Sequence, residues 1–183
     1  MKNKFLTGEN VLLRGVEPGD ADFILRMEND PEVWPVSNTI VPFSRFQVEQ
    51  YALATQHDIF SEKQLRLMID IKLSGTKGKT IGAIDLYDFD PYHKRAGVGI
   101  LIIKEDREKG YASESLELLI NYSFKVLLFH QLYCSISPEN TPSIHLFEKH
   151  GFVKCGIRKE WRLSAGKWTD EIMFQLINSY DHQ

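Results

Sequence analysis

Residues 102–126 read IIKEDREKGYASESLELLINYSFKV, and this stretch joins a pattern typical of a buried strand to one typical of an amphipathic helix. Residues 99–103 are apolar and mostly β-branched, as in a buried strand. From Ala112 onward, apolar residues recur every three or four positions, which predicts one buried helix face. The apolar positions of that face are Ala112, Leu116, Leu119, Ile120, Phe124 and Leu127. The chain is therefore expected to pass from a central strand straight into a long helix.

A short turn of the form R-x-x-G-x-A, residues 107–112, lies between this strand and this helix. The first N–H groups of a helix have no partner within it, and the positive end of the helix dipole lies there, so a helix start binds anions and phosphate above all. Gly110 would permit a positive φ and close backbone approach, and Ala112 adds no bulk. Arg107 and Lys109 would add positive charge at the mouth. The same pattern also fits an ordinary strand–loop–helix connection, because short glycine motifs recur by accident.

Two other phosphate-binding motifs are absent from the sequence. There is no G-x-x-x-x-G-K-[ST], which argues against a P-loop. No G-x-G-x-x-G opens a βαβ unit either, which argues against a dinucleotide-binding fold.

The composition is that of one globular domain spanning residues 1–183. Of the 183 residues, 43% are hydrophobic and 26% are charged, with a formal net charge of −3. No apolar run approaches the ~20 residues of a membrane span, and the start MKNKFLTGEN lacks the apolar core of a signal peptide. Mild acidity and the lack of a basic run argue against a nucleic-acid partner. Cys134 and Cys155 have no metal or disulfide spacing, so we expect two reduced thiols, no metal and a cytoplasmic protein.

The remaining patterns indicate a chain that mixes strands and helices. Strands are predicted at residues 10–14, 65–73, 80–87, 95–103, 132–137, 152–157 and 168–177. Further helices are predicted after Pro18, from a capping box at residues 44–47 to about His57, and from Thr141 as the N-cap to Gly151. A hairpin loop is expected at residues 74–78, and a break in the strand at residues 88–93. This order predicts an α+β fold.

An apolar segment lies between the first two predicted helices. It contains Trp34, Val36, Ile40, Val41 and Phe43. Such a segment either lines the core or forms a wall for a substrate, and packing is the commoner role of aromatic residues. Core lining is the expectation, and the substrate wall stays open as the alternative.

Two further blocks of sequence carry a family resemblance. Residues 140–152 have the form N-x-x-S-x-x-L-F-E-K-x-G-F, and residues 13–20 (LRGVEPGD) precede NDPEV at residues 29–33. Together with the R-x-x-G-x-A turn, these blocks resemble the GNAT superfamily of acyl-CoA-dependent N-acetyltransferases. The nearest branch holds the ribosomal-protein N-terminal acetyltransferases and the bacterial spermidine acetyltransferases. The resemblance covers nearly the whole chain, from about residue 11 to residue 177.

The resemblance implies a mixed, mostly antiparallel sheet of about seven strands flanked by helices. It also implies that the sheet splays open near Ile102 and Ile103, where the co-substrate acetyl-CoA inserts its pantetheine arm like an extra strand. The pyrophosphate would then bind at Arg107, Glu108, Lys109, Gly110, Tyr111, Ala112 and Ser113. Asn140 matches the family position that hydrogen-bonds the cofactor, and Ser143, one helical turn further on, would also face it. The alternatives are that Asn140 shapes its loop and that Ser143 caps the helix.

Acetyl transfer to an amine requires a neutral amine, a stabilised oxyanion and a proton for the departing thiolate. A backbone N–H near Ile102 or Ile103 would polarise the carbonyl group. Many family members place a proton-donating tyrosine at the position of Phe147, which here has no hydroxyl and is expected to pack beside the thiol arm of the cofactor. The substitutes are a bound water or side chains of the preceding strand, namely Tyr133, Cys134, Ser135 and Ser137. Ser137 is the expected donor because it lies nearest the strand end.

Asp85 and Asp88 are expected near the acceptor amine, where they would act on its proton. Their stretch DLYD, followed by HKRA, is similar to the acidic stretch of spermidine acetyltransferases, but that branch has a glutamate where this chain has Gly97. Strand alternation would point the two aspartates to opposite faces unless the strand breaks between them. The alternative is that both are solvated turn residues, and His93 is expected to be a surface turn residue.

The expected activity is transfer of an acetyl group from acetyl-CoA to a primary amine. The acceptor would be a small amine, such as a polyamine, or the N-terminus of a protein or peptide. A module that senses acyl-CoA without turnover is the alternative that the phenylalanine at position 147 motivates. A third reading is a structural or interaction protein that keeps only the fold. A homodimer is compatible with each of these readings.

Overall fold

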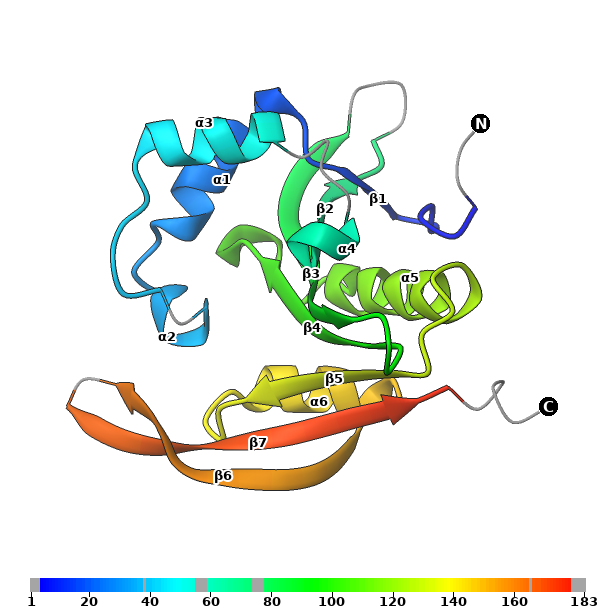
Figure 1. The fold of residues 1–183 in the computed structure, drawn as a ribbon. Helices are drawn as coiled ribbons and strands as arrows, with labels where there is room; N and C mark the ends of the chain where they lie inside the picture. Colours follow the sequence, from blue (N-terminus) through cyan, green and yellow to red (C-terminus); the bar gives the residue numbers. More distant parts are fainter. Residues whose placement is uncertain (1–3, 38, 55–58, 74–77, 165, 179–183) are drawn as a thin grey trace.

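The computed structural model describes residues 4–37, 39–54, 59–73, 78–164 and 166–178. One seven-stranded sheet runs through it in the order β1-β2-β3-β4-β5-β7-β6 (Figure 1). The strands are β1 Val11–Gly15, β2 Gln64–Ile71, β3 Lys79–Asp90, β4 Arg95–Ile102, β5 Gln131–Ile136, β6 Val153–Ser164 and β7 Lys167–Ile177. Only β4 and β5 pair in parallel, which confirms the predicted α+β fold with a mixed and mostly antiparallel sheet.

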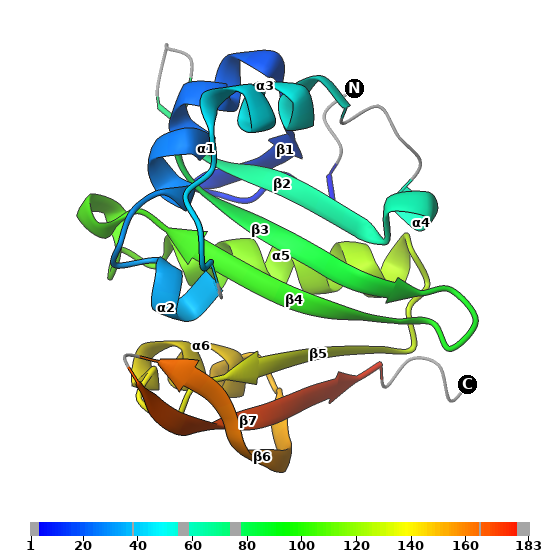
Figure 2. The same cartoon turned by 60° about the vertical axis from the view of Figure 1, so that its left-hand side comes forward.

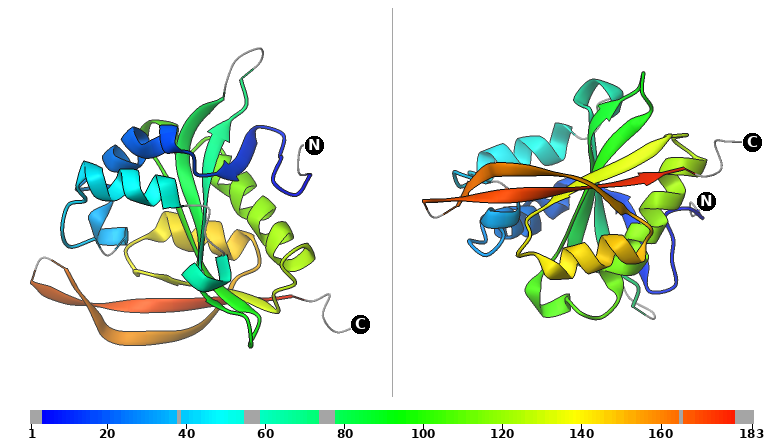
Figure 3. Two further views of the ribbon diagram at one scale, coloured as in Figure 1. Left: turned by 45° about the horizontal axis from the view of Figure 1, so that its top comes forward. Right: turned by 90° about the horizontal axis from the view of Figure 1, so that it is seen from below.

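Helices cover both faces of the sheet. They are α1 Ala21–Glu28, α2 Trp34–Ser37, α3 Arg45–Ala54, α4 Ile59–Glu62, α5 Tyr111–Lys125 and α6 Thr141–Lys149, with short 3-10 turns at Pro18–Asp20 and Lys104–Asp106. Figure 3 shows α1 and α3 on one side of the sheet and α5 on the other. Among the described residues, no helix is long and apolar enough to cross a membrane.

The sheet divides the core into two apolar clusters because neighbouring side chains of a strand point to opposite faces. Leu67 and Ile69 of β2 enter the larger cluster with Leu116 and Leu119 of α5. Met68, which lies between them, enters a smaller cluster under α1 and α3. The face under α5 and α6 is called the inner face below, and the face under α1 and α3 is called the outer face.

The sheet opens between β4 and β5. These strands share three residue pairs, Arg95↔Gln131, Ala96↔Leu132 and Gly97↔Tyr133, and then separate (Figure 2). Beyond this point, residues 98–102 of β4 remain paired with β3, and residues 134–136 of β5 remain paired with β7. The result is a V between the two strands, closed at Gly97 and Tyr133, which confirms the splayed sheet that the resemblance implied.

Two local predictions differ from the structure. β3 does not break at Asp88 but continues to Asp90, because Asp88 takes a positive φ of 51° and the register shifts by a bulge. The cap of α6 is Asn140 rather than Thr141, since the Asn140 side chain accepts the Ser143 N–H at 3.3 Å. The capping box at Ser44 is confirmed. The predicted helix end near residue 57 and all of the hairpin loop predicted at residues 74–78 except Gly78 lie outside the described residues.

The apolar segment after α1 does not line the core as expected. Ile40 is 86% exposed and Val41 is 69% exposed, and Phe43 is also exposed. Trp34 is half-buried, with its indole N–H donating to the Glu28 carbonyl at 2.9 Å. The segment is therefore a surface feature on the outer face.

A buried ionic network ties β1, β2, β3 and the turn before α1 together. The Arg14 guanidinium donates to both Asp20 oxygens, at 2.7 and 2.8 Å, and from Nε to Asp70 at 2.7 Å. Thr80 completes the network by hydrogen-bonding both Arg14 and Asp70. Asp20 and Asp70 are buried, so removing the arginine would take away the cation that hydrogen-bonds both carboxylates.

We predict that Arg14→Met lowers the free energy of unfolding by about 3 kcal/mol or more, the usual loss when one partner of a buried ion pair is removed. The matched control is Arg45→Met. Arg45 also pairs with an aspartate, Asp22, but both side chains are exposed. Its loss should be below about 1 kcal/mol. Urea denaturation measures both values, and equally small losses would contradict the structural role of the Arg14 network.

Candidate active site

The turn before α5 has the backbone geometry of an anion site. Gly110 is the N-cap with φ 84°, and Glu108 also has a positive φ, of 62°. The first helical bond runs from the Glu114 N–H to the Gly110 carbonyl at 3.1 Å. Within the described chain, no acceptor receives the N–H groups of residues 108–113. These free donors and the helix dipole make the predicted pyrophosphate turn suited to phosphate.

The two cationic side chains of the turn hydrogen-bond groups of the chain just before it, and their expected charge at its mouth stays a prediction. Arg107 donates from Nε to the Ile102 carbonyl at 2.9 Å. Lys109 donates to the Glu105 carbonyl at 2.7 Å and to Asp106 at 2.9 Å. Asp106 is buried, and hydrogen bonds from Lys79 and then Lys109 lower the pKa of its carboxyl group. Both cations therefore stabilise the turn, because Lys109 pairs with the buried carboxylate of Asp106 and Arg107 donates to the end of β4.

Two residues that the sequence did not single out lie beside this turn. The C-terminal end of α6 brings His150 Nε2 within 2.8 Å of Ser113 Oγ, and Lys149 Nζ donates to the same oxygen at 3.1 Å. Burial, and then the charge of Lys149, lower the pKa of His150. The motif L-F-E-K-x-G-F contained the lysine, but no spacing rule could show that it reaches residue 113.

The residues expected at the other wall of the cofactor site have structural partners. Asn140 caps α6 through the Ser143 N–H, which is the loop-shaping role that the sequence left open for Asn140. Phe147 is 3% exposed and stands edge-on to Phe152, with 4.9 Å between ring centroids. Ile102 is buried and Ile103 is half-buried, both in the larger cluster, at the open end of the V. Contact of these residues with a cofactor stays a prediction.

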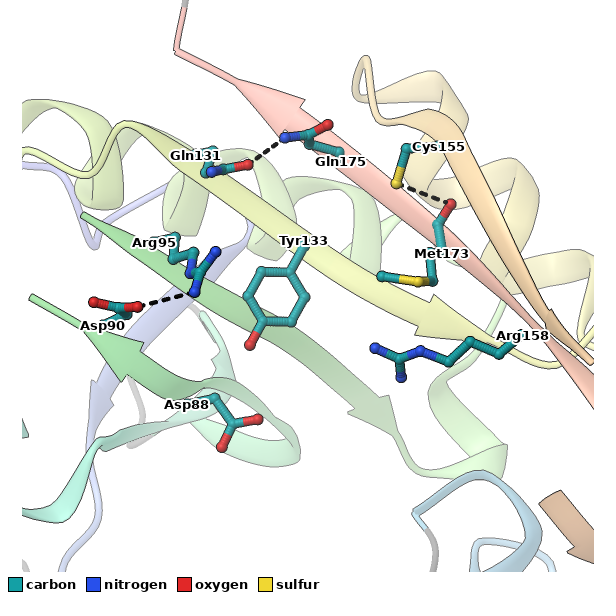
Figure 4. Close-up of a pocket in the computed structure, with 9 residues that line it drawn as sticks. All are labelled: Asp88, Asp90, Arg95, Gln131, Tyr133, Cys155, Arg158, Met173 and Gln175. Carbon is teal, nitrogen blue, oxygen red and sulfur yellow. Dashed lines mark hydrogen bonds and ion pairs between the residues drawn. The ribbon is translucent and has the colours of Figure 1, made fainter. Parts of the chain in front are cut away.

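A hollow of about 420 Å³ lies on the outer face at the closed end of the V (Figure 4). Leu132 and Cys134 point into the larger cluster, so Tyr133 between them points to the outer face. Figure 4 shows the Tyr133 ring in the middle of the hollow, between Arg95 and Arg158. The hollow takes the name apex hollow below, and its polar lining includes Asp88, Asp90, Arg95, Gln131, Tyr133 and Arg158.

Asp85 and Asp88 have different environments, although both were expected at the acceptor. Both Asp85 oxygens accept hydrogen bonds from Arg66, at 2.8 and 3.0 Å, and Arg66 also pairs with Glu28 at 2.6 Å. Asp88 is exposed, lines the apex hollow and has no ion pair with any described residue. The structure therefore places Asp88 in the hollow and engages Asp85 in an ionic cluster under α1.

The remaining polar candidates are also engaged. Ser137 donates its hydroxyl to Glu139, beyond the end of β5. His93 is an exposed turn residue bonded to Asp90 at 2.8 Å, as expected. In the described part of the chain, no group of three or more His, Cys, Asp or Glu side chains could hold a metal ion.

Tyr87 explains the glycine at position 97. The two residues are direct partners on β3 and β4. A Cβ atom at Gly97 would lie 2.2 Å from the Tyr87 ring, so the ring occupies the space of any side chain there. The ring also stands edge-on to Tyr133, at 6.1 Å between centroids. Burial raises the pKa values of both tyrosines, which keeps their hydroxyl groups protonated at neutral pH.

We predict that Gly110→Val greatly weakens binding of CoA, the ligand that the resemblance implies, while the protein remains folded. A valine side chain would stand where the phosphates approach the free N–H groups, and its positive φ adds about 1–3 kcal/mol of backbone strain. Isothermal titration calorimetry with CoA measures the loss of affinity.

The matched control is Gly166→Val in the turn between β6 and β7. Gly166 also has a positive φ, 78°, and open space around a built Cβ, so it carries the same strain. This variant should bind CoA as the wild type does. Equal affinity of both variants would remove the turn as the phosphate site.

Comparison with known proteins agrees with this geometry. The model of the acetyltransferase (GNAT) domain family matches residues 10–153. The uncharacterized N-acetyltransferase p20 of Bacillus licheniformis is 31% identical over 92% of this chain and 93% of that protein. The spermidine N(1)-acetyltransferase of Vibrio cholerae is 27% identical over 91% of this chain and 92% of its own length. A crystal structure of the V. cholerae spermidine N-acetyltransferase in complex with CoA and spermine superposes with a TM-score of 0.82 at 26% identity, covering 94% of this chain and 98% of that one. The chain therefore belongs to the GNAT acetyltransferase family.

Proposed function

We propose that the chain transfers the acetyl group of acetyl-CoA to a primary amine bound in the apex hollow. The observation that carries this proposal is that Tyr133, whose pair with Gly97 closes the V, also lines the hollow. An acetyl group at the end of the V would meet an amine arriving from the outer face. The V. cholerae relative, solved with CoA and spermine, supports both a CoA ligand and an amine acceptor. The family match supports transfer rather than the sensor alternative.

The cofactor would extend from the helix start to the closed end of the V. Its pyrophosphate would accept hydrogen bonds from the N–H groups of residues 108–113, with Lys149 as the nearby cation. Its pantetheine arm has two amide groups. Residues 98–102 and 134–136 line the V without pairing to each other, so their backbone groups there can hydrogen-bond these amides. Asn140 and Ser143 would face the same arm from the start of α6.

The reaction forms a C–N bond and breaks the C–S bond of the thioester. The ammonium group, held by Asp88, gives a proton to solvent water, and the neutral amine then attacks the acetyl carbon; the second proton that the nitrogen loses balances the one that the thiolate takes up. A backbone N–H of β4 beyond Gly97 would stabilise the oxyanion. The departing thiolate must then take a proton. A thiol has an ordinary pKa of about 8.5, so its thiolate is a tolerable leaving group and a weak acid suffices.

Tyr133 is a better candidate for this proton donor than Ser137. It lies at the closed end of the V, where the thioester would end, and its raised pKa keeps the hydroxyl protonated. Ser137 lies four residues further along, about 13 Å at 3.3 Å per residue. Its hydroxyl proton is also already donated to Glu139. We therefore replace the predicted Ser137 by Tyr133.

The proposal also covers the domain organisation, the cellular location and the partners of the chain. We propose one catalytic domain across residues 1–183, a cytoplasmic location and no nucleic-acid partner, on the sequence grounds given above. A homodimer stays a prediction, which sedimentation of the purified chain would test.

We predict that Asp88→Asn raises the KM for the acceptor amine about ten- to a hundred-fold, because a hydrogen bond to a charged group contributes about 1.5–3 kcal/mol. CoA binding should not change, since the carboxylate lies on the outer face. The matched control is Asp85→Asn, which removes a charge three residues away. That variant should lower stability, because Arg66 loses a partner, and leave the KM nearly unchanged. Steady-state kinetics of both variants measure the KM for the amine. An unaltered KM for Asp88→Asn would exclude Asp88 as the amine ligand.

We predict that Tyr133→Phe lowers kcat about 10²-fold, the lower end of a general-acid effect, with little change in CoA affinity. Ser137→Ala should leave kcat within about twofold. Thiol release measured with saturating acetyl-CoA compares the two variants. A slow Ser137→Ala enzyme beside a normal Tyr133→Phe enzyme would restore Ser137 as the donor.

A further inference from the structure

We propose that the acceptor is a small zwitterionic amine, that is, a primary amine that also carries a carboxylate, rather than a polyamine. This inference rests on the proposed function and concerns the second charged group of the acceptor. The apex hollow presents an unpaired carboxylate on one side of Tyr133 and a partly free guanidinium on the other. These two groups match the two ends of a zwitterion.

The hollow has too few free carboxylates to bind a polyamine, which carries two or more ammonium groups. Arg66 occupies both oxygens of Asp85. No acid can stand at position 97, because the Tyr87 ring fills that space. Asp90 accepts hydrogen bonds from His93, which lower its pKa to about 2, and it pairs with Arg95 at 3.0 Å. Among the described lining residues, Asp88 alone is left to bind an ammonium group.

Arg158 is held so that part of its guanidinium faces the hollow. Its Nη1 donates to Glu171 at 3.2 Å, and its Cζ lies 4.8 Å from the centroid of the Trp161 ring. Within the described residues these two groups are its partners, and its side chain remains 39% exposed. Figure 4 shows the guanidinium end pointing toward Tyr133.

The local backbone orients this arginine. The register of β6 against β7 shifts between Arg158 and Arg162, and Glu160 takes a positive φ of 47°. Bulges of this kind re-aim side chains and are frequent beside active sites. An arginine has five N–H donors in a planar fork that fits a carboxylate with two parallel hydrogen bonds. Arg158 is therefore the carboxylate ligand of the proposal, opposite Asp88.

The test compares diamines with amino acids that differ from them by one carboxylate. The pairs are 1,3-diaminopropane with 2,4-diaminobutyrate, putrescine with ornithine, and cadaverine with lysine, and spermidine is the polyamine. The readout is kcat/KM from thiol release with saturating acetyl-CoA. In at least one pair the amino acid should exceed its diamine about ten- to a hundred-fold, the size expected for a charge-assisted contact, and should also exceed spermidine.

Variants of Arg158 show whether this residue causes the preference. Arg158→Gln should abolish it by slowing the amino acid, while the diamine rate stays within about twofold. Arg158→Lys keeps a positive charge beside Glu171 but cannot form two parallel hydrogen bonds with a carboxylate, so it should retain part of the preference. Because the ion pair with Glu171 is kept, this variant also controls for a folding defect in Arg158→Gln. The matched control is Lys159→Gln, which removes a neighbouring charge that pairs with Asp170 on the exposed surface and should keep the full preference.

The outcomes separate the two proposals. A preference for spermidine, or no amino acid better than its diamine in any pair, overturns the zwitterionic acceptor and leaves amine acetylation intact. A preference that survives in both Arg158 variants also overturns it. Absence of thiol release with every amine overturns the proposed function and this inference with it.

Discussion

The parting of β4 and β5 after three residue pairs is the constraint on which the rest of the site depends. Parallel strands that stop pairing expose backbone N–H and C=O groups, and these groups need partners if they are buried. Each strand can part from the other because its far edge is secured: β3 pairs with β4 up to Ile102, and β7 pairs with β5 over its whole length. The opening is therefore a stable feature of the folded chain. It leads from the turn before α5 to the apex hollow. The parting of β4 from β5 therefore positions both proposed substrates, acetyl-CoA and the amine.

The charged side chains fall into two groups that differ in how completely they are paired. Arg14, Arg66 and Asp106 each bind two oppositely charged partners. These clusters hold β1 to β2 and to the turn before α1, β2 to β3 under α1, and the turn before α5 to β3. Asp88 and Arg158 border a hollow and keep unused hydrogen-bonding capacity toward it. Buried charges that lack partners are strongly disfavoured, whereas exposed charges are solvated by water until a ligand binds. This contrast supports a structural role for the first group and the proposed recognition role for the second.

The sequence predicted most elements because their signals are local. Apolar periodicity placed the strands and the long helix, and Gly110 indicated the positive φ that the structure has. The predictions failed where a signal depended on a neighbour. β3 continues through Asp88 because a bulge accommodates this residue within the strand, and no local sequence rule predicts a strand there. The apolar segment around Ile40 looked like core, yet Ile40 and Val41 are largely exposed. Lys149 and His150 reach Ser113 only because α6 packs with its end against the start of α5.

By itself the sequence determined the order of most elements, the glycine turn before α5 and the family, because hydrophobic period, glycine position and motif spacing are properties of neighbouring residues. Only the tertiary structure decided which of two aspartates, three residues apart, is free. The register of β2 against β3 sets Arg66 directly opposite Asp85 and leaves Asp88 without an ion pair among the residues that the structure describes. Likewise, the register of β3 against β4 sets Tyr87 opposite Gly97 and removes the space for a further acid. Strand register arises from contacts between residues far apart in the chain, and for that reason charge pairing in the hollow could not be derived from spacing alone.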